Sequence, residues 1–398
     1  MYMRKSLFLV TFLASFSIIS ISNTEKIVNE IIEEDIKKIN EIEKQTIYDE
    51  DGIEKNENKF KVKDDKNGKI VFNKDISSND VIVNSNEKAK SLRVENNANI
   101  SSSKEIILGN KETHKEGQIS ESVEYKNLVY VINNKSITTS LDDVTALGLN
   151  STYVYYKNAE NSSLKGGVEL NAKNLGVLDN AGIIDSLCFV SEEGGSLINR
   201  KTGLIKNIRM VTTGDVNLKN EGKIESGLFV DVNNSSSSKI VNSGEIKGNL
   251  YIQNTDADID YDKKTIFLNT KTGVIKEADS HLIVGLNMNF ENFGHIESKT
   301  DLYINTLKGR IDNNNKIKGN MSVEDYTFID ISDKTKEIAP LKVNLQNGVL
   351  EGDLILKKKD FNETIVTIKS LDNVTGTLDS SEGKNDTLRL FGSGEVTS

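Results

Sequence analysis

The chain has 398 residues, of which only 6% are aromatic and none is Trp, so a fold built from many small, similar layers is favoured over one large aromatic core. The formal net charge of -10 argues against a nucleic-acid partner, because phosphate binding needs clustered positive charge. The single Cys188 excludes an internal disulfide framework and a multi-cysteine metal or iron–sulfur site.

The N-terminus has the features of a secretory signal peptide. Arg4 and Lys5 precede an apolar run over residues 7–21, interrupted only by Thr and Ser, which is short for a membrane span. Ser20 and Ser22 have the small-x-small spacing of a cleavage site, so we predict cleavage after Ser22. An uncleaved membrane anchor is the alternative.

The next segment predicts one amphipathic helix over residues 24–46, followed by a polar linker over residues 49–65. The helix could cap the end of the following domain or pair with another copy as a short coiled coil. We favour the cap, because fewer than four heptads are present. Its apolar residues recur at steps of three and four: Val28, Ile32, Ile36, Ile39 and Ile42.

Beyond residue 60 the sequence keeps returning to a short phrase, in which a Gly and one variable residue are followed by an aliphatic residue. In one copy Asn replaces the Gly, and Asn is the non-Gly residue that best tolerates a left-handed backbone. We therefore expect these turn positions to adopt that conformation. They are Gly182, Gly203, Gly222, Gly244, Gly273, Gly294 and Asn315.

The turn positions are mostly about 21 residues apart, which is the period of a solenoid. A second phrase follows in several copies, as in Gly248-Asn-Leu-Tyr-Ile252, so each repeat is interpreted as turn, short strand, turn, alternating strand. Such short strands cannot cover their apolar faces alone and must stack. We predict an all-β fold, a right-handed parallel β-helix whose coils are most regular from about residue 170. The alternative, a β-sandwich, would have turns every 8 to 12 residues without one recurring phrase.

Two consequences follow for the positions of side chains. Aliphatic residues such as Ile246 should point inward and stack from coil to coil. The asparagines that precede the turns should align at one corner and bond to one another or to the turn backbone. These are Asn180, Asn220, Asn242, Asn292 and Asn313.

These repeats resemble the passenger domains of bacterial autotransporters (type V secretion). The resemblance covers roughly residues 170–398, and its most typical stretches are 242–252 and 385–394, with the signal peptide in front. It implies export across the inner membrane of a Gram-negative-type envelope, passage through an outer-membrane translocator β-barrel, and display at the cell surface or release. The sequence lacks the aromatic-girdled strands of a C-terminal barrel, so we expect either a truncated or split member or a passenger whose translocator lies elsewhere.

Three regions are therefore predicted: a signal peptide at 1–22, the helix and linker at 23–60, and β-helix passenger repeats at 61–398. The last coil, over residues 376–398, is expected to fray or to self-associate through unpaired strand edges.

The sequence offers few groups for catalysis or for cofactor binding, and no cofactor is expected. His114, His281 and His295 lie in no metal-ligand motif, and His295 should lie on an exposed face. Cys188 is interpreted as a small core residue. One acidic cluster is a weak candidate for Ca²⁺, although a solvated loop is the favoured interpretation: Asp256, Asp258, Asp260 and Asp262.

We expect a non-enzymatic surface passenger that acts in adhesion or aggregation, with host or bacterial surface ligands as partners. A carbohydrate-active β-helix enzyme is one alternative, by analogy of fold alone. The exoprotein of a two-partner secretion system is another, although the Asn-Pro phrases usual in that class are missing and the only proline is Pro340.

Overall fold

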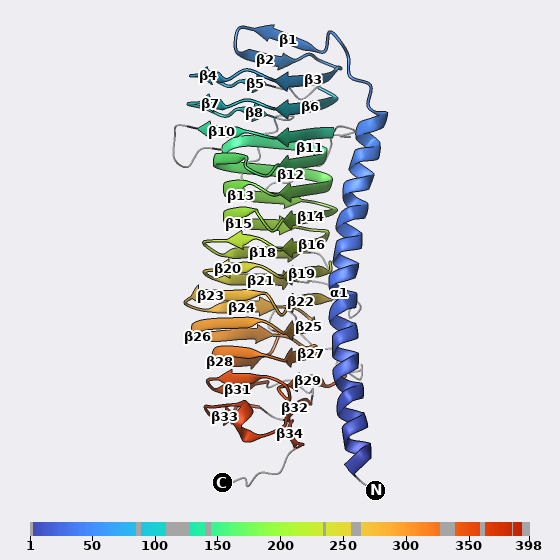
Figure 1. Cartoon of the computed structure of the whole chain (residues 1–398), viewed down its shortest axis with the longest axis vertical. Helices are drawn as coiled ribbons and strands as arrows, with labels where there is room; N and C mark the ends of the chain where they lie inside the picture. Colours follow the sequence, from blue (N-terminus) through green and yellow to red (C-terminus); the bar gives the residue numbers. More distant parts are fainter. Residues whose placement is uncertain are drawn as a thin grey trace.

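The computed structural model is a parallel β-solenoid of about 12 turns, with successive turns about 22 residues apart, and one long helix beside it (Figure 1). It describes residues 3–84, 89–108, 128–139, 145–233, 236–255, 264–326, 339–358, 363–383 and 385–391, with side chains from Thr24 onward. The predicted fold class is confirmed. In the part of the chain that is described, no helix combines the length and apolar character needed to cross a bilayer.

Each turn carries three strands, one more than the repeat phrases indicated. We name the three resulting sheets face A, face B and face C in chain order. Face A was missed because it has no glycine phrase of its own. Its strands are β3 (Asn67–Phe72), β6 (Ser91–Asn96), β9 (Leu128–Asn133), β14 (Gly194–Asn199), β16 (Asp215–Asn220), β19 (Ser238–Asn242), β22 (Thr265–Asn269), β25 (Asn287–Asn292), β27 (Lys308–Asn313), β29 (Leu341–Asn344), β32 (Thr364–Ile368) and β34 (Asp386–Leu390).

Faces B and C correspond to the two strands that were predicted. Face B has the shorter strands, which are β4 (Ile76–Ser78), β7 (Ile100–Ser102), β10 (Ser136–Thr139), β17 (Lys223–Ile224), β20 (Glu245–Lys247), β23 (Val274–Ala278) and β30 (Val349–Glu351). Face C contains β2 (Lys59–Val62), β5 (Val83–Asn84), β8 (Ile107–Leu108), β18 (Leu228–Asn233), β21 (Leu250–Thr255), β24 (His281–Val284), β31 (Leu354–Lys357) and β33 (Leu378–Asp379).

The remaining strands bend around a corner and serve two or three faces. They are β11 (Thr145–Asn158), β12 (Ser163–Asn180), β13 (Ile183–Ser191), β15 (Leu204–Thr212), β26 (His295–Asn305) and β28 (Lys316–Glu324). One turn of 3₁₀-helix, η1 (Leu371–Asn373), lies between β32 and β33.

The core runs along the axis of the rod as one cluster of buried apolar side chains that extends from Val62 to Val374. Ile246 is fully buried and pairs with Ile224 and Ile275 in the neighbouring turns, so its predicted inward orientation is confirmed. The inward stack of face B consists of Ile184, Ile205, Ile224, Ile246, Ile275, Ile296, Ile317 and Leu350, each no more than 1% exposed.

The N-terminal end of the rod is covered by a hairpin. Residues 53–62, which we expected within a linker, form β1 (Ile53–Asn56) and β2, and these two strands are antiparallel. Strand β2 also pairs in parallel with β5, so the hairpin belongs to the solenoid. The linker prediction was therefore wrong here, because the alternation of Phe60 and Val62 with Lys was too short a pattern to be noticed.

The helix α1 (Met3–Gln45) contains the predicted amphipathic segment, but it does not cap the end of the rod. It lies along face A and runs in the opposite direction to the succession of turns (Figure 1). Val28 and Ile32 pack near β22, whereas Ile39 packs near β9. The expected position was wrong because face A has apolar residues on its outer side as well, including Tyr155 and Ile198.

Candidate functional site: the outer surfaces of the rod

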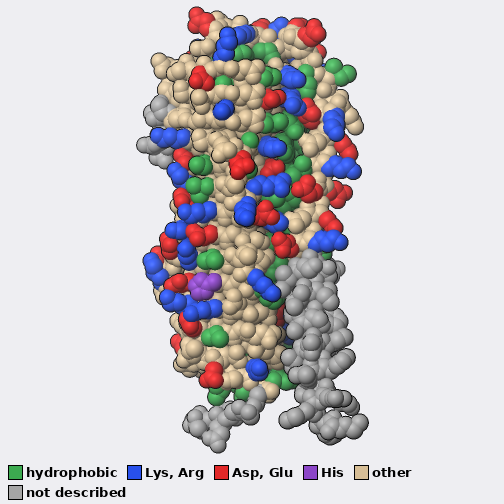
Figure 2. Space-filling model, viewed as in Figure 1, with side chains coloured by type: hydrophobic (Ala, Val, Ile, Leu, Met, Phe, Trp, Pro, Cys, Tyr) green, Lys and Arg blue, Asp and Glu red, His purple; other side chains and the backbone are tan. Residues whose placement is uncertain are grey.

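The three outer surfaces differ in chemistry, and this difference indicates where a ligand would bind. The outer side of face A is largely apolar and is covered by α1. Figure 2 shows green apolar side chains along the seam between the helix and the upper part of the rod. The apolar residues of face A in this interface are Leu128, Tyr130, Tyr155, Leu175, Val177, Ile198, Val241 and Leu268.

The outer side of face B and its flanking turns carry acidic and basic residues that pair between turns. Lys206 contacts Asp185 at 2.6 Å, and Lys276 contacts Glu245 at 3.2 Å. Figure 2 shows acids and bases intermixed along the side of the rod away from α1. Exposed pairs of this kind stabilise a fold little, so we interpret this face as a solvated surface.

The outer side of face C carries a strip of aromatic and apolar side chains, one from each successive turn. Parallel pairing aligns them directly, since Arg209 pairs with Phe229, Phe229 with Tyr251, and Leu282 with Tyr303. Tyr251 pairs with Leu282 and completes the row. We call this row the aromatic strip: Arg209, Phe229, Tyr251, Leu282 and Tyr303.

The members of the aromatic strip contact one another. The rings of Phe229 and Tyr251 stack with centroids 4.9 Å apart and planes 9° apart, and the Arg209 guanidinium lies 5.8 Å from the Phe229 centroid. The Tyr251 hydroxyl donates to Gln253 at 3.0 Å. Apart from the exposed Arg209, these side chains are neither buried nor fully exposed, so the strip presents partly apolar surface to solvent.

The polar groups beside the strip have shifted pKa values. Partial burial raises the pKa of Asp231, and Arg209 opposes this rise in part. The pKa of the Tyr303 hydroxyl is raised, chiefly because it donates to the carboxylate of Asp301 at 2.8 Å. Stacked rings with hydroxyl, amide and carboxylate groups at their edges suit the binding of a long, extended ligand parallel to the rod.

Cys188 lies in the same register, one turn before Arg209, and its side chain is partly exposed. The prediction that it fills the core was wrong, because its neighbours Leu187 and Phe189 take the inward positions. Burial, and secondly Glu169, raise the pKa of the thiol, which disfavours the reactive thiolate.

The seven turn positions lie between face A and face B, as the repeat predicted, but not for the predicted reason. Their backbones are not left-handed within the described residues. Instead, a Cβ atom at Gly222 would collide with the carbonyl oxygen of Gly203, and one at Gly244 would collide with that of Gly222. Glycine is favoured at these six turns because the backbone of the preceding turn lies where a Cβ atom would be.

The left-handed glycines lie at other corners, for example Gly248, with φ of 78°, and Gly319, with φ of 117°. Asn315, which replaces glycine in the last of the seven turns, is bonded to the preceding turn instead. Its side chain donates to the backbone oxygen of Phe293 at 3.0 Å. The stretch Lys66-Asn-Gly-Lys-Ile70 matches the same phrase in sequence, but it does not form this turn, because Gly68 lies within β3.

The asparagines at the end of face A form one buried ladder, as predicted, and it is twice as long as expected. Each donates its side-chain amide to the side-chain oxygen of the next, at 2.8 or 2.9 Å. We call this the asparagine ladder, and its members are Asn96, Asn133, Asn158, Asn180, Asn199, Asn220, Asn242, Asn269, Asn292 and Asn313.

His281 was not singled out from the sequence, yet it joins three turns at the corner between faces B and C. It is fully buried, its Nδ1 accepts from the backbone N–H of Leu250 at 3.2 Å, and its Nε2 lies 3.2 Å from the backbone oxygen of Glu297. This pattern requires the neutral ring with hydrogen on Nε2. Burial lowers the pKa of His281 to about 4. His295 is partly exposed in its turn, as predicted, and His114 lies outside the described residues.

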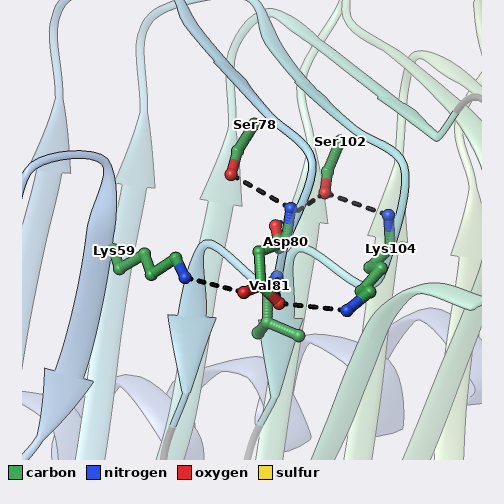
Figure 3. Close-up of polar contacts among 6 residues, drawn as sticks. All are labelled: Lys59, Ser78, Asp80, Val81, Ser102 and Lys104. Carbon is green, nitrogen blue, oxygen red and sulfur yellow. Dashed lines mark hydrogen bonds and ion pairs between the residues drawn. The ribbon is translucent and has the colours of Figure 1, made fainter.

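Asp80 joins three turns at the corner between β4 and β5 (Figure 3). Its carboxylate accepts from Lys59 Nζ at 2.6 Å, from the backbone N–H of Val81 at 2.9 Å and from Lys104 Nζ at 3.4 Å. These hydrogen bonds, that of Lys59 foremost, lower the pKa of Asp80. Each of these hydrogen bonds joins Asp80 to its own turn or to a neighbouring turn. We therefore interpret this cluster as structural.

The corner between faces C and A is the one whose length varies most. β8 ends at Leu108 and β9 begins only at Leu128, and β28 ends at Glu324 while β29 begins at Leu341. The predicted acidic cluster, Asp256, Asp258, Asp260 and Asp262, belongs to this corner and lies outside the described residues. Among the residues that are described, no three acidic, His or Cys side chains come together as metal ligands.

Residues beside these longer connections form hydrogen bonds and an ion pair with residues of other turns. The Tyr326 hydroxyl donates to the backbone oxygen of Asn254 at 2.9 Å, and the buried Lys358 donates to that of Thr306 at 2.6 Å. Lys358 also pairs with Asp325 at 3.3 Å. The corner therefore has a rigid base within the described part of the chain.

Comparison with known proteins gives no relative: no protein-family model, no curated protein and no solved structure matches the chain.

Proposed function

We propose that this chain is an exported surface passenger, similar to those of autotransporters, that acts by adhesion and not by catalysis. The observation that carries the proposal is the aromatic strip on face C, displayed along a rigid rod. Adhesion to an extended ligand needs a long surface with repeated contacts, and a parallel solenoid supplies one contact position per turn.

The N-terminal sequence supports the export step. The pair of Glu25 and Lys219 at 3.4 Å and the packing of Val28 and Ile32 on face A all lie after the predicted cleavage site. Removal of residues 1–22 would therefore leave these contacts intact. Mass analysis of the N-terminus of the exported product tests this step. A start within a few residues of Asn23 supports it, and a product that still begins at Met1 contradicts it.

Adhesion is tested with the purified chain that begins at Asn23. Binding to immobilised host matrix proteins, to bacterial surface polysaccharide and to itself is compared with that of an unrelated acidic protein of similar size. Saturable binding above the control supports the proposal. Binding no stronger than the control to all three surfaces contradicts it.

A carbohydrate-active enzyme is the second candidate. The observation in its favour is Asp231, a carboxyl with a raised pKa whose Oδ1 has no hydrogen-bond partner, close to the cationic Arg209. Such a pair can serve acid–base chemistry on a sugar. Release of reducing or unsaturated sugars from acidic polysaccharides by the pure protein, lost in Asp231→Asn, would favour this function over adhesion.

A further inference from the structure

The contact between α1 and face A is an interface between two separable bodies. Its apolar part consists of two clusters, one around Val28 and Ile32 and one around Ile39. All three side chains are fully buried, although they belong to a helix that lies outside the solenoid. Exposure of this much apolar surface on face A would be unfavourable, so the helix or an equivalent must cover it.

Polar contacts fix the register of the helix on the rod. Ser196 Oγ donates to Asp35 Oδ2 at 2.5 Å, and the Tyr130 hydroxyl donates to Asn40 Oδ1 at 2.9 Å. Further out, acids of the helix meet bases of the rod. These pairs are Glu25 with Lys219, Glu33 with Arg200, and Glu43 with Arg93. The surface of face A is therefore specific for this helix in one direction.

The helix is joined to the rod only at one end, by the residues after Gln45. The next residues already belong to the rod, since Asn67 donates to the backbone oxygen of Ile47 at 2.8 Å and to Asp49 Oδ2 at 2.8 Å. Any rotation of the helix away from the rod must therefore occur in the backbone between Gln45 and Ile47. It lies at the hairpin end of the rod, so a helix that swings out there points away from its own face A (Figure 1).

We propose that α1 exchanges between copies, so that the helix of one chain docks on face A of a second chain. Exchange replaces each contact of the interface by the identical contact between two chains, so its cost is only that of association. A second copy supplies the one helix whose apolar positions and acids match face A. This inference holds whether or not the protein is an adhesin.

The experiment is cross-linking between two full-length chains, each with Cys188→Ser and one introduced cysteine, so that each chain carries a single thiol. One chain carries Asp35→Cys and the other Ser196→Cys. They are mixed, incubated and treated with a short bis-maleimide. The control replaces the first chain with Ile27→Cys, since Ile27 is 47% exposed on the same helix and lies two turns away from position 35.

We expect a product of twice the chain mass that contains both substituted chains. This product should be absent from the Ile27→Cys mixture. A double variant, Asp35→Cys with Ser196→Cys in one chain, must also cross-link. If it does so only within its own chain, and the mixture gives no dimer above the control, exchange is overturned. If the double variant does not cross-link at all, the interface itself is contradicted.

Discussion

The side-chain amide of Asn220 donates to the side-chain oxygen of Asn242 in the next turn at 2.8 Å, and accepts from Asn199 in the turn before. Both partners are fully buried. An amide is suited to this position because it offers donor and acceptor on the same flat group, so each turn satisfies the next. The ladder is flanked by apolar residues at the same position, Phe72 before it and Leu345 after it.

Replacement of Asn220 by Ala should leave two buried amides without one partner each, and we expect the free energy of unfolding to fall by about 3 kcal/mol. Asn207→Ala is the matched control, because Asn207 is exposed on the neighbouring strand β15. Chemical denaturation of both variants checks this. Equal losses for the two would mean that the buried amide of Asn220 contributes no more to stability than an exposed one.

Ile246→Asp should cost several kcal/mol, roughly 3 to 5, since it places a carboxylate among aliphatic side chains in the centre of the rod. Glu245→Asp is the control on the adjacent, outward position. A melting temperature for Ile246→Asp no lower than that for Glu245→Asp would contradict the assigned orientation.

Gly222→Ala should destabilise the protein by about 2 kcal/mol or more, because the added methyl group collides with the backbone of the preceding turn. The converse change, Asn315→Gly, should cost about 1 kcal/mol, chiefly through the lost hydrogen bond to Phe293. Thermal unfolding of both variants distinguishes this account from one based on a left-handed backbone, in which Asn315→Gly would be neutral or stabilising because glycine adopts that conformation most readily.

The buried His281 predicts a loss of stability in mild acid. Its pKa is about 4 in the folded protein and 6.5 in the unfolded chain, so the unfolded chain binds the proton more readily. The contribution is complete above pH 6.5 and is lost as the pH falls toward 4, up to about 3 kcal/mol. Unfolding measured from pH 7 to pH 4 should show a flatter profile for His281→Gln than for the wild type. An unchanged slope in His281→Gln would contradict the assignment.

The repeat of the sequence was sufficient to predict a parallel β-helix, since glycine and aliphatic positions recur in phase with the turns. Two of the five missed members of the asparagine ladder, Asn199 and Asn269, are followed by connections two residues longer than those after Asn220 and Asn242. The other three, Asn96, Asn133 and Asn158, precede turns that contain no glycine. An aliphatic or aromatic residue two positions before each Asn, as in Ile240 and Asn242, is the signal that would have identified the rest.

Other features depend on contacts between distant segments, which one sequence does not show. The apolar residues on the outer side of face A became informative only when α1 was seen to cover them. The glycine positions could be identified from the repeat, whereas the reason for them is the approach of a neighbouring turn. The aromatic strip draws one residue from each turn, about 22 residues apart, so no local motif marks it.

The most direct test of the proposed function is to remove the aromatic strip without disturbing the core. In the chain that begins at Asn23, Phe229→Ser with Tyr251→Ser is compared with Ile183→Ser and Val349→Ser, which replace exposed apolar residues of face B. All variants should fold, as circular dichroism can verify, and binding to whichever surface the wild type recognises is then measured. The account predicts that the strip variant loses binding at least tenfold, the equivalent of about 1.4 kcal/mol, while the face B variant binds as the wild type does. Wild-type affinity in the folded strip variant would contradict the proposal that face C is the adhesive surface.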